Sequence, residues 1–178
     1  MHSSTISNNQ VFDIFIQAEN YEKIIKNNNV QLYKDYNEIK QSIIDIKKIT
    51  DEKYNPIKVP SHNDPLVDNW VITQSGRLYL IDWEYSGKNE AMWDLSCLSI
   101  EANYSDKEDN ILLNSYFGKD YIHQKAYFLT TKLYIDYLWT LWGLARIPYS
   151  DAKFMQEYAD MRYERLKNNL ELYKKLYS

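Results

Sequence analysis

Three oxygen-bearing side chains within a short stretch offer the chemistry of phosphoryl transfer. Asp64 and Asn69 lie in the segment His-Asn-Asp-Pro-Leu-Val-Asp-Asn, and Asp82 follows an apolar run eighteen residues after Asp64. Phosphoryl transfer needs a carboxylate near the attacking hydroxyl and oxygen ligands that hold magnesium on the triphosphate. The spacing predicts that Asp64 and Asn69 share one tight loop, where one faces the hydroxyl and the other reaches a metal.

A β-hairpin is the element that must bring Asp82 to this loop. The runs 70–73 and 78–81 are rich in β-branched and aromatic residues and flank a turn, which predicts two short strands. A hairpin returns the chain close to where it left, so Asp82 is expected beside Asp64. Loop formation alone explains Asp64 and Asn69 about equally well, but the run Ile-Asp-Trp-Glu-Tyr-Ser-Gly after the hairpin favours the catalytic interpretation.

Helical spacing covers most of the remaining chain. Two helices are expected in the first fifty residues, separated at the asparagine triplet 27–29, and a polar connector is expected over 51–60 because of its two prolines. Further helices are predicted over 91–102, from a capping box at Ser105 to Gly118, over 120–146, and from a cap at 150–151 to Tyr173. The predicted fold is one domain over 1–178, mainly α with a small β-hairpin.

Composition narrows the functional classes. The net charge of −4 over 178 residues argues against a nucleic-acid partner, and no apolar run is long enough for a membrane span. The single cysteine, Cys97, is expected to be a small buried residue, and together with the lack of a signal sequence it suggests a cytoplasmic protein. The seventeen tyrosines and five tryptophans supply ring faces that could bind a cation.

The two motifs together resemble the choline/ethanolamine kinase family, which shares the protein-kinase-like fold. The resemblance runs from the His-Asn-Asp…Asn segment through Ile-Asp-Trp-Glu-Tyr-Ser-Gly and Asn89 to Trp93-Asp94-Leu95. It implies that Asp64 is the catalytic base, that Asn69 and Asp82 are Mg²⁺ ligands, and that ATP is the phosphoryl donor. It further implies that His62 and Asp94 support the loop structurally.

The resemblance also implies a site for a small amino alcohol, choline or ethanolamine. Its acidic and aromatic side chains would be Glu84, Tyr85, Glu101, Trp139, Trp142 and Tyr158. From their spacing alone the two tryptophans would be read as core residues, whereas the resemblance favours an aromatic cage for a quaternary ammonium. Tyr104 is a weaker candidate, offset by one or two residues from the family's position.

The chain contains no glycine-rich loop and no lysine–glutamate pair of an upper kinase lobe. The resemblance begins at Met1-His2-Ser3, past the hinge between lobes, so we expect a C-terminal lobe with the N-terminal lobe absent, either as a piece of a longer enzyme or as a natural remnant. Weak nucleotide affinity and little turnover are expected of this lobe alone. We also expect self-association through the face left by the missing lobe.

Two other functions remain open at this point. An aminoglycoside phosphotransferase shares the His-x-Asp…Asn and Ile-Asp patterns, although its pockets are broad and acidic rather than aromatic. A non-catalytic choline-binding module is the second alternative. The sequence does not decide between choline and ethanolamine.

Overall fold

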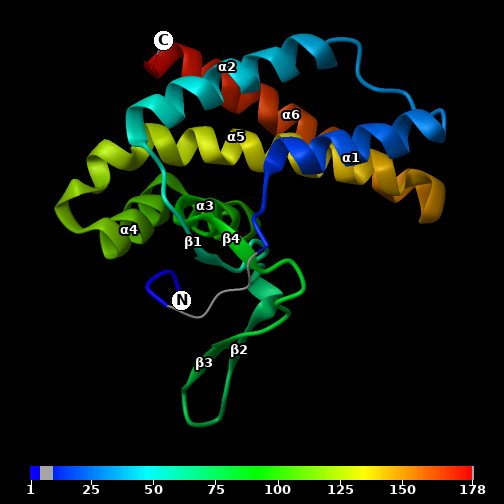
Figure 1. Cartoon of the computed structure of the whole chain (residues 1–178). Coiled ribbons are helices and arrows are strands. Elements are labelled where there is room, and N and C mark those ends of the chain that lie inside the picture. The colour runs from blue at the N-terminus through cyan, green and yellow to red at the C-terminus, as the bar shows by residue number, and fades with distance from the viewer. Residues whose placement is uncertain (5–9, 178) are drawn as a thin grey trace. The chain divides into compact units, whose positions relative to one another are not determined.

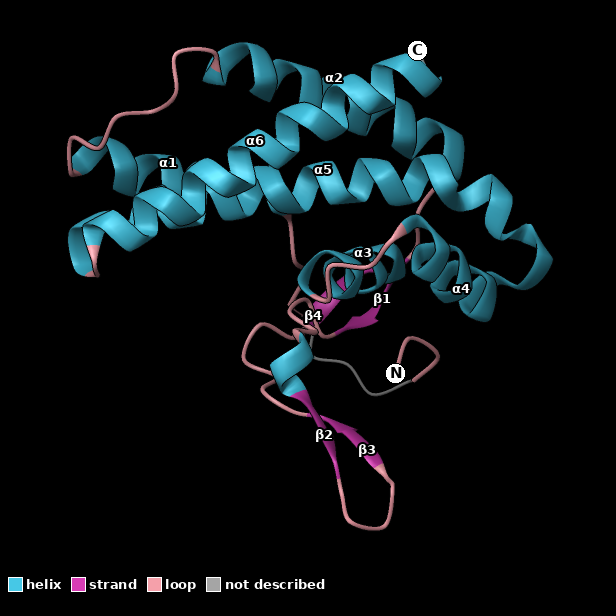
Figure 2. Ribbon diagram, turned by 180° about the vertical axis from the view of Figure 1, so that it is seen from behind, coloured by secondary structure: helices cyan, strands magenta, loops and turns pink. Residues whose placement is uncertain are grey.

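The computed structural model describes residues 1–4 and 10–177, and this part of the chain is mainly helical with two small antiparallel sheets (Figures 1 and 2). The predicted fold class is confirmed. The chain divides into two compact units, the first formed by residues 1–12 and 56–131 and the second by residues 13–55 and 132–178. The single domain expected over 1–178 stays a prediction.

The first unit contains both sheets. Strands β2 (Trp70–Ile72) and β3 (Leu78–Leu80) form the predicted hairpin, which extends away from the rest of this unit in Figure 1. Strands β1 (Lys58–Ser61) and β4 (Gly87–Glu90) pair antiparallel, and the sequence did not predict them. The prediction of a connector over 58–60 is therefore wrong. Pro60 is accommodated because a two-stranded sheet consists only of edge strands, where a missing N–H is tolerated.

The helices of the first unit follow the predicted bounds closely. They are α3 (Ala91–Glu101), α4 (Asp106–Phe117) and the first part of α5 (Tyr121–Arg146), with short 3₁₀ helices η1 (Val67–Asn69) and η2 (Gly118–Asp120). The Glu108 carboxylate accepts hydrogen bonds from the backbone N–H and hydroxyl of Ser105, at 2.8 and 2.6 Å. Gly118 ends α4 with a φ of 63°, a conformation that glycine adopts without steric cost.

The second unit consists of α1 (Ile14–Asn27), α2 (Tyr36–Tyr54), the remainder of α5, η3 (Ile147–Tyr149) and α6 (Ala152–Tyr177). The predicted break after Asn27 is confirmed. Helix α2 continues to Tyr54, so the first four residues of the predicted connector are helical; the helix ends at Asn55, which adopts the left-handed conformation, ahead of Pro56. Helix α6 runs four residues beyond the predicted end, since no glycine or proline stops it.

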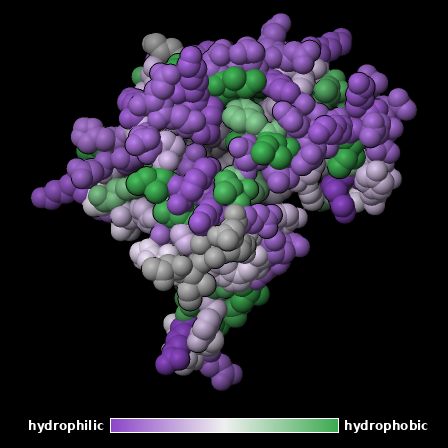
Figure 3. All heavy atoms as spheres, viewed as in Figure 1, coloured by the Kyte–Doolittle hydropathy of each residue, from purple (hydrophilic) through white to green (hydrophobic). Residues whose placement is uncertain are grey.

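The cores and the exposed surface follow from the same elements. In the second unit the apolar stripes predicted for the first two helices bury Ile25 and Ile43, and in the first unit Cys97 is fully buried, as predicted. The β2–β3 hairpin exposes the side chains of Val71, Ile72, Leu78 and Tyr79, and Figure 3 shows hydrophobic, green surface on this hairpin. Within the described residues no helix is both long and apolar enough to span a membrane.

Candidate active site

The loop that carries Asp64, residues 61–69 and here called the Asp64 loop, is held by a buried carboxylate. Asp94, near the start of α3, accepts hydrogen bonds from the backbone N–H groups of His62 and Asn63, each at 2.8 Å. Asp94 is 5% exposed, and His62 and Asn63 are fully buried. A buried carboxylate requires such donors, and buried amides require an acceptor. The negative charge of Asp94 thereby fixes the start of the loop.

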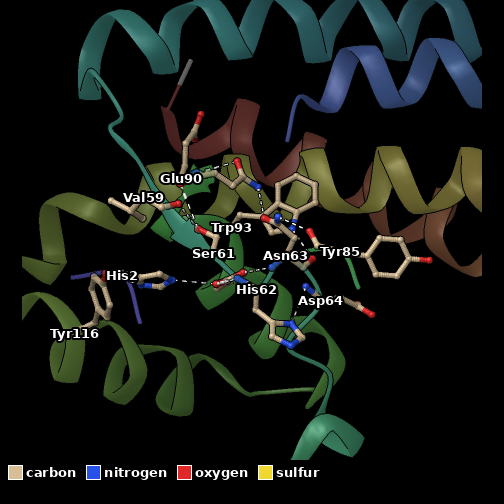
Figure 4. Close-up of polar contacts among 12 residues, drawn as sticks. His2, Val59, Ser61, His62, Asn63, Asp64, Tyr85, Glu90, Trp93 and Tyr116 are labelled. Atoms are coloured by element: carbon tan, nitrogen blue, oxygen red, sulfur yellow. Dashed lines mark hydrogen bonds and ion pairs between the residues drawn. The ribbon is translucent and has the colours of Figure 1, made fainter. Parts of the chain in front are cut away.

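Asn63 is the centre of a second set of contacts. Its Nδ2 donates to the Tyr85 carbonyl at 2.8 Å, its Oδ1 accepts from Asn89 Nδ2 at 2.9 Å, and its carbonyl accepts from Trp93 Nε1 at 2.9 Å. Asn63 has a φ of 71°, and asparagine tolerates this left-handed conformation better than most residues. Figure 4 shows Asn63 at the middle of this network.

The backbone of Ile81 is hydrogen-bonded to the Asp64 loop, which places the neighbouring Asp82 beside that loop. The Ile81 N–H donates to the Asn69 carbonyl at 2.9 Å, and the Ile81 carbonyl lies 2.9 Å from Nε2 of His62. Because Nδ1 of His62 accepts from the Asp64 N–H at 3.3 Å, the ring carries its proton on Nε2 and donates to Ile81. The structure therefore brings Asp64, Asn69 and Asp82 together within the first unit.

Asp64 has a carboxyl group of altered acidity. Burial, followed by the negative charges of Glu101, Asp82 and Glu84, raises its pKa to about 6, with His62 acting in the opposite direction. A carboxyl with a pKa near neutrality is suited to exchange a proton with a substrate hydroxyl. The same contributions indicate that four carboxylates gather in one region of the first unit.

The oxygen atoms in this region suit a magnesium ion. Asn69 uses its amide nitrogen to donate to the Asp64 carbonyl at 3.0 Å, and its amide oxygen is the atom that a cation would take. Asp82 is exposed and has a φ of 62°, an uncommon conformation that is frequently found at functional sites. No group of three or more His, Cys, Asp or Glu side chains arranged to hold a metal occurs in the described ranges. Mg²⁺ commonly takes only one or two carboxylates and completes its shell with water and phosphate oxygens, so the pair fits the ion.

The acidic residues predicted to bind substrate lie around Asp64, but Tyr85 differs from them. Glu84 is exposed, and Glu101, the last residue of α3, is half-buried. Tyr85 is 39% exposed, and Figure 4 shows its ring directed away from Asn63. Its backbone carbonyl contacts the Asp64 loop, where it accepts the hydrogen bond from Asn63 Nδ2.

The predicted aromatic residues of the second unit form one cluster, here called the aromatic cluster: Trp139, Trp142 and Tyr158. The ring centroids of Trp139 and Trp142 are 5.9 Å apart at 89°, and those of Trp142 and Tyr158 are 5.5 Å apart at 72°. Edge-to-face contacts of this kind are the favoured geometry of aromatic pairs. Trp139 is 9% exposed, whereas Trp142 and Tyr158 are half-buried.

Some supporting residues were not identified from the sequence. They include Asn63, Asn89 and Trp93, which form the network described above. His2 is a further one: its Nε2 contacts Asp94 Oδ2 at 3.0 Å, and its Nδ1 contacts the Tyr116 hydroxyl at 2.8 Å. These contacts join residues about thirty or about a hundred positions apart, so no local pattern reveals them. The motif that contains Asn89 and Trp93 was the one available signal.

Tyr104, the weaker candidate, lines a cavity of about 430 Å³ in the first unit. The other lining residues are apolar and come from η1, from the hairpin and from the end of α3: Val67, Trp70, Leu78, Leu98 and Ala102. The cavity surface is mostly carbon, so it offers no carboxylate for a cation.

Comparison with protein families gives a match over most of the chain. Residues 3–131 match the model of the choline/ethanolamine kinase family. Protein LicA of Haemophilus influenzae is 29% identical over 151 residues, which cover 80% of this chain and 55% of that protein. A LicA homolog of Metamycoplasma hominis is 28% identical over 98 residues, 54% of this chain and 38% of that protein. The chain thus spans about half or less of the length of these relatives.

Solved structures show the same similarity in three dimensions. LicA in complex with AMP superposes with a TM-score of 0.84 at 26% identity, covering 97% of this chain and 58% of that one. Choline kinase LicA from Streptococcus pneumoniae gives 0.81 at 26% identity, with 96% and 59% covered. A choline/ethanolamine kinase family protein from Mesorhizobium loti gives 0.82 at 29% identity, with 96% and 58% covered.

Proposed function

The chain belongs to the choline/ethanolamine kinase family, and from this premise we propose that it is the catalytic lobe of a choline kinase. It would transfer the γ-phosphoryl group of ATP to the hydroxyl of choline, giving phosphocholine. The observation that carries the proposal is the assembly of Asp64, Asn69 and Asp82 around a loop whose backbone is held by Asp94. The relative that was solved with AMP supports an adenine nucleotide as the phosphoryl donor.

Asp64 is the proposed catalytic base. Its raised pKa, about 6, leaves the carboxylate ionised at neutral pH and able to accept the hydroxyl proton as the oxygen attacks phosphorus. His62 and Asp94 act on the loop rather than on the substrate, because they make hydrogen bonds with residues of the loop, the end of the hairpin and the N-terminal segment.

Asn69 and Asp82 are the proposed ligands of Mg²⁺. When bound, the ion would neutralise charge on the phosphate oxygens. Asp82 supplies a full negative charge from the end of the hairpin, and Asn69 supplies a neutral oxygen beside the backbone of Asp64. Because Asp82 and Asn69 would hold the metal, the Asp64 carboxylate stays available to the substrate hydroxyl.

The substrate ammonium is proposed to be recognised by two kinds of side chain. Glu84 and Glu101 supply negative charge near Asp64, and Tyr85 would join them only if its ring turned toward the loop. Trp139, Trp142 and Tyr158 supply ring faces, which attract a desolvated cation by about 2 kcal/mol in favourable cases. An ammonium without N–H groups depends on such faces, so we propose choline ahead of ethanolamine.

Three further properties are proposed for the chain. It associates with a second copy through the face left by the missing lobe, and we propose the exposed hairpin side chains of Val71, Ile72, Leu78 and Tyr79 as the contact surface; sedimentation at increasing concentration would detect the dimer. Replacing Ile72, which is 73% exposed, by Glu is expected to return a dimer to the monomer.

The chain is further proposed to work in the cytoplasm, where ATP is supplied. As an isolated lobe it is proposed to phosphorylate its substrate slowly.

The proposed function is tested by phosphocholine formation from MgATP and choline, with Asp64→Asn as the decisive variant. Loss of a catalytic base lowers the rate by about 10²–10⁴-fold. Asp68→Asn is the matched control, because Asp68 lies on the same loop with an exposed side chain, and it should retain the wild-type rate. Equal rates for wild type and Asp64→Asn would refute the assignment of the base.

Calorimetric titration separates the proposed kinase from a choline-binding module. The kinase predicts binding of choline and, in the presence of Mg²⁺, of ATP, with the latter weakened by Asp82→Asn. Choline binding without nucleotide binding, even after addition of a complementary upper lobe, would favour the module. Absence of choline binding would contradict both.

A further inference from the structure

The aromatic cluster is joined to a buried ion network on the same two helices. Asp136 of α5 is fully buried and accepts two hydrogen bonds from Arg165, Nε to Oδ2 at 2.8 Å and Nη2 to Oδ1 at 2.6 Å. Arg162 Nη1 approaches the same carboxylate at 3.4 Å. A bidentate pair with a second guanidinium nearby gives the buried charge the partners that it requires.

Arg162 also lies over a ring of the cluster. Its guanidinium carbon is 4.9 Å from the centroid of Tyr158, one helical turn earlier on α6. The side chain of Arg162 is 5% exposed, against 32% for Arg165, so water screens the contact between guanidinium and ring only weakly. In the described part of the chain Arg165 makes no ring contact. The two arginines therefore share one carboxylate but differ in their relation to the cluster.

The contacts continue from Tyr158 to the tryptophans. Tyr158 meets Trp142 edge to face, and Trp142 meets Trp139 in the same manner. A Cβ on Gly143 would lie 2.9 Å from Cδ1 of Tyr158, so the ring occupies space that only glycine leaves open. Tyr158 is thus confined between Gly143 and Arg162.

We propose that Arg162, anchored by Asp136, is a positioning residue that fixes the orientation of Tyr158 and, through it, of Trp142 and Trp139. Because one face of Tyr158 already holds the guanidinium, Tyr158 offers a ligand cation only its other face, and the two tryptophans supply the remaining ring faces. The proposal rests on the proposed role of the aromatic cluster in binding the substrate ammonium.

A consequence for specificity follows from the chemistry of the two ammonium groups. A quaternary ammonium has no N–H and is bound through ring faces and long-range charge, whereas a primary ammonium donates hydrogen bonds to carboxylates. Disordered rings should therefore weaken choline more than ethanolamine. A loss of stability alone would weaken both ligands equally.

The test compares Arg162→Met with Arg165→Met by calorimetric titration of choline and of ethanolamine into the whole chain. Arg162→Met should lower choline affinity about 10-fold and ethanolamine affinity less than about 3-fold. Arg165→Met should leave both affinities within about 3-fold, although its melting temperature falls. Equal effects of the two substitutions on choline would overturn the proposal.

The near-UV circular dichroism of the ligand-free protein reports the tryptophan geometry directly. Arg162→Met should change the tryptophan bands, while Arg165→Met should not; unchanged bands in Arg162→Met would also overturn the proposal. If the methionine variants unfold, Arg162→Lys and Arg165→Lys replace them, and a spectral change is again expected only at position 162. A lysine keeps the charge but lacks the planar group that lies on the ring.

Trp142→Leu separates this inference from the function on which it rests. If Trp142→Leu binds choline as the wild type does, the cluster is not the ammonium site and that part of the proposed function fails. The near-UV comparison still decides whether Arg162 orients the rings. If Trp142→Leu loses choline while Arg162→Met keeps it, only the positioning role is wrong.

Discussion

The Asp64 loop and the aromatic cluster hold their side chains by different means. In the loop, one buried carboxylate accepts from two backbone amides, and Asn63 makes three further hydrogen bonds. In the cluster, rings meet edge to face and pack into space left by a glycine. Hydrogen bonds fix a loop that has no regular structure, whereas ring packing suffices between helices that are already rigid. The two regions should therefore respond differently to substitution.

The largest effect is expected from Asp94→Ala in the loop unit. It leaves the amides of His62 and Asn63 buried without their acceptor, at a cost of about 3–5 kcal/mol in the free energy of unfolding. Urea denaturation measures the loss, and hydrogen exchange at the two amides locates it. Asp68→Ala, on the exposed side of the same loop, is the control and should change stability little. A loss below about 1 kcal/mol for Asp94→Ala would contradict the account of the loop.

An intermediate effect is expected from Gly143→Ala in the cluster unit. Alanine favours a helix by about 1 kcal/mol, but its Cβ would meet Tyr158 at 2.9 Å and Ala159 at 3.2 Å. Overpacking of this kind costs about 1–3 kcal/mol, so the net change should be destabilising. Thermal unfolding measures it, and the tryptophan circular dichroism should change with it. A more stable variant would mean that the cluster does not depend on the close approach.

A smaller and pH-dependent effect is expected from Asp64→Asn in metal-free buffer. The pKa of Asp64 is raised from 3.8 to about 6, so the folded state disfavours the carboxylate above pH 6, and the penalty disappears below about pH 4. Asp64→Asn should therefore raise the free energy of unfolding at pH 7.5 by about 1 kcal/mol, allowing for solvent screening, and leave it unchanged at pH 4. Denaturation curves at the two pH values check this. If the difference in the free energy of unfolding were the same at both pH values, burial and the neighbouring carboxylates would not raise the pKa of Asp64.

The smallest effect is expected at the surface pair Lys153 and Glu157. Their charged groups are 3.8 Å apart, with side chains 87% and 65% exposed. Exposed pairs contribute little, so Lys153→Ala should change the free energy of unfolding by less than about 0.5 kcal/mol. This variant serves as the reference for an exposed pair, because the arginines that pair with Asp136 lie on the same helix α6, while Asp136 itself is fully buried on α5. A large loss in the free energy of unfolding would imply that the contribution of an ion pair depends on its charge rather than on its burial.

Prediction from the sequence was accurate where local signals are strong. The capping box at Ser105, the glycine after α4 and the proline-limited end of α5 gave helix bounds that the structure confirms. It failed for β1 and β4, because the segment Gly87–Glu90 is polar and its partner contains Pro60; neither carries the alternation that marks a strand. Their pairing depends on the tertiary structure alone.

The site was predicted unevenly for the same reason. Asp64, Asn69 and Asp82 were found because loop residues of a motif are contiguous or separated by one hairpin. Among the residues that hold them, His2 is distant in sequence and has no distinctive spacing, and the motif that contains Asn89 does not reveal what Asn89 contacts. Their importance arises from burial, which makes each unpaired polar group costly.

The sequence by itself determined which side chains could do chemistry and where most helices begin and end, because both depend on residue type and on spacing along the chain. Only the tertiary structure decided that Asp64 lies among carboxylates which raise its pKa, and that Arg162 rather than Arg165 lies over Tyr158. These properties depend on distance and exclusion of water, and neither quantity exists until the chain is folded.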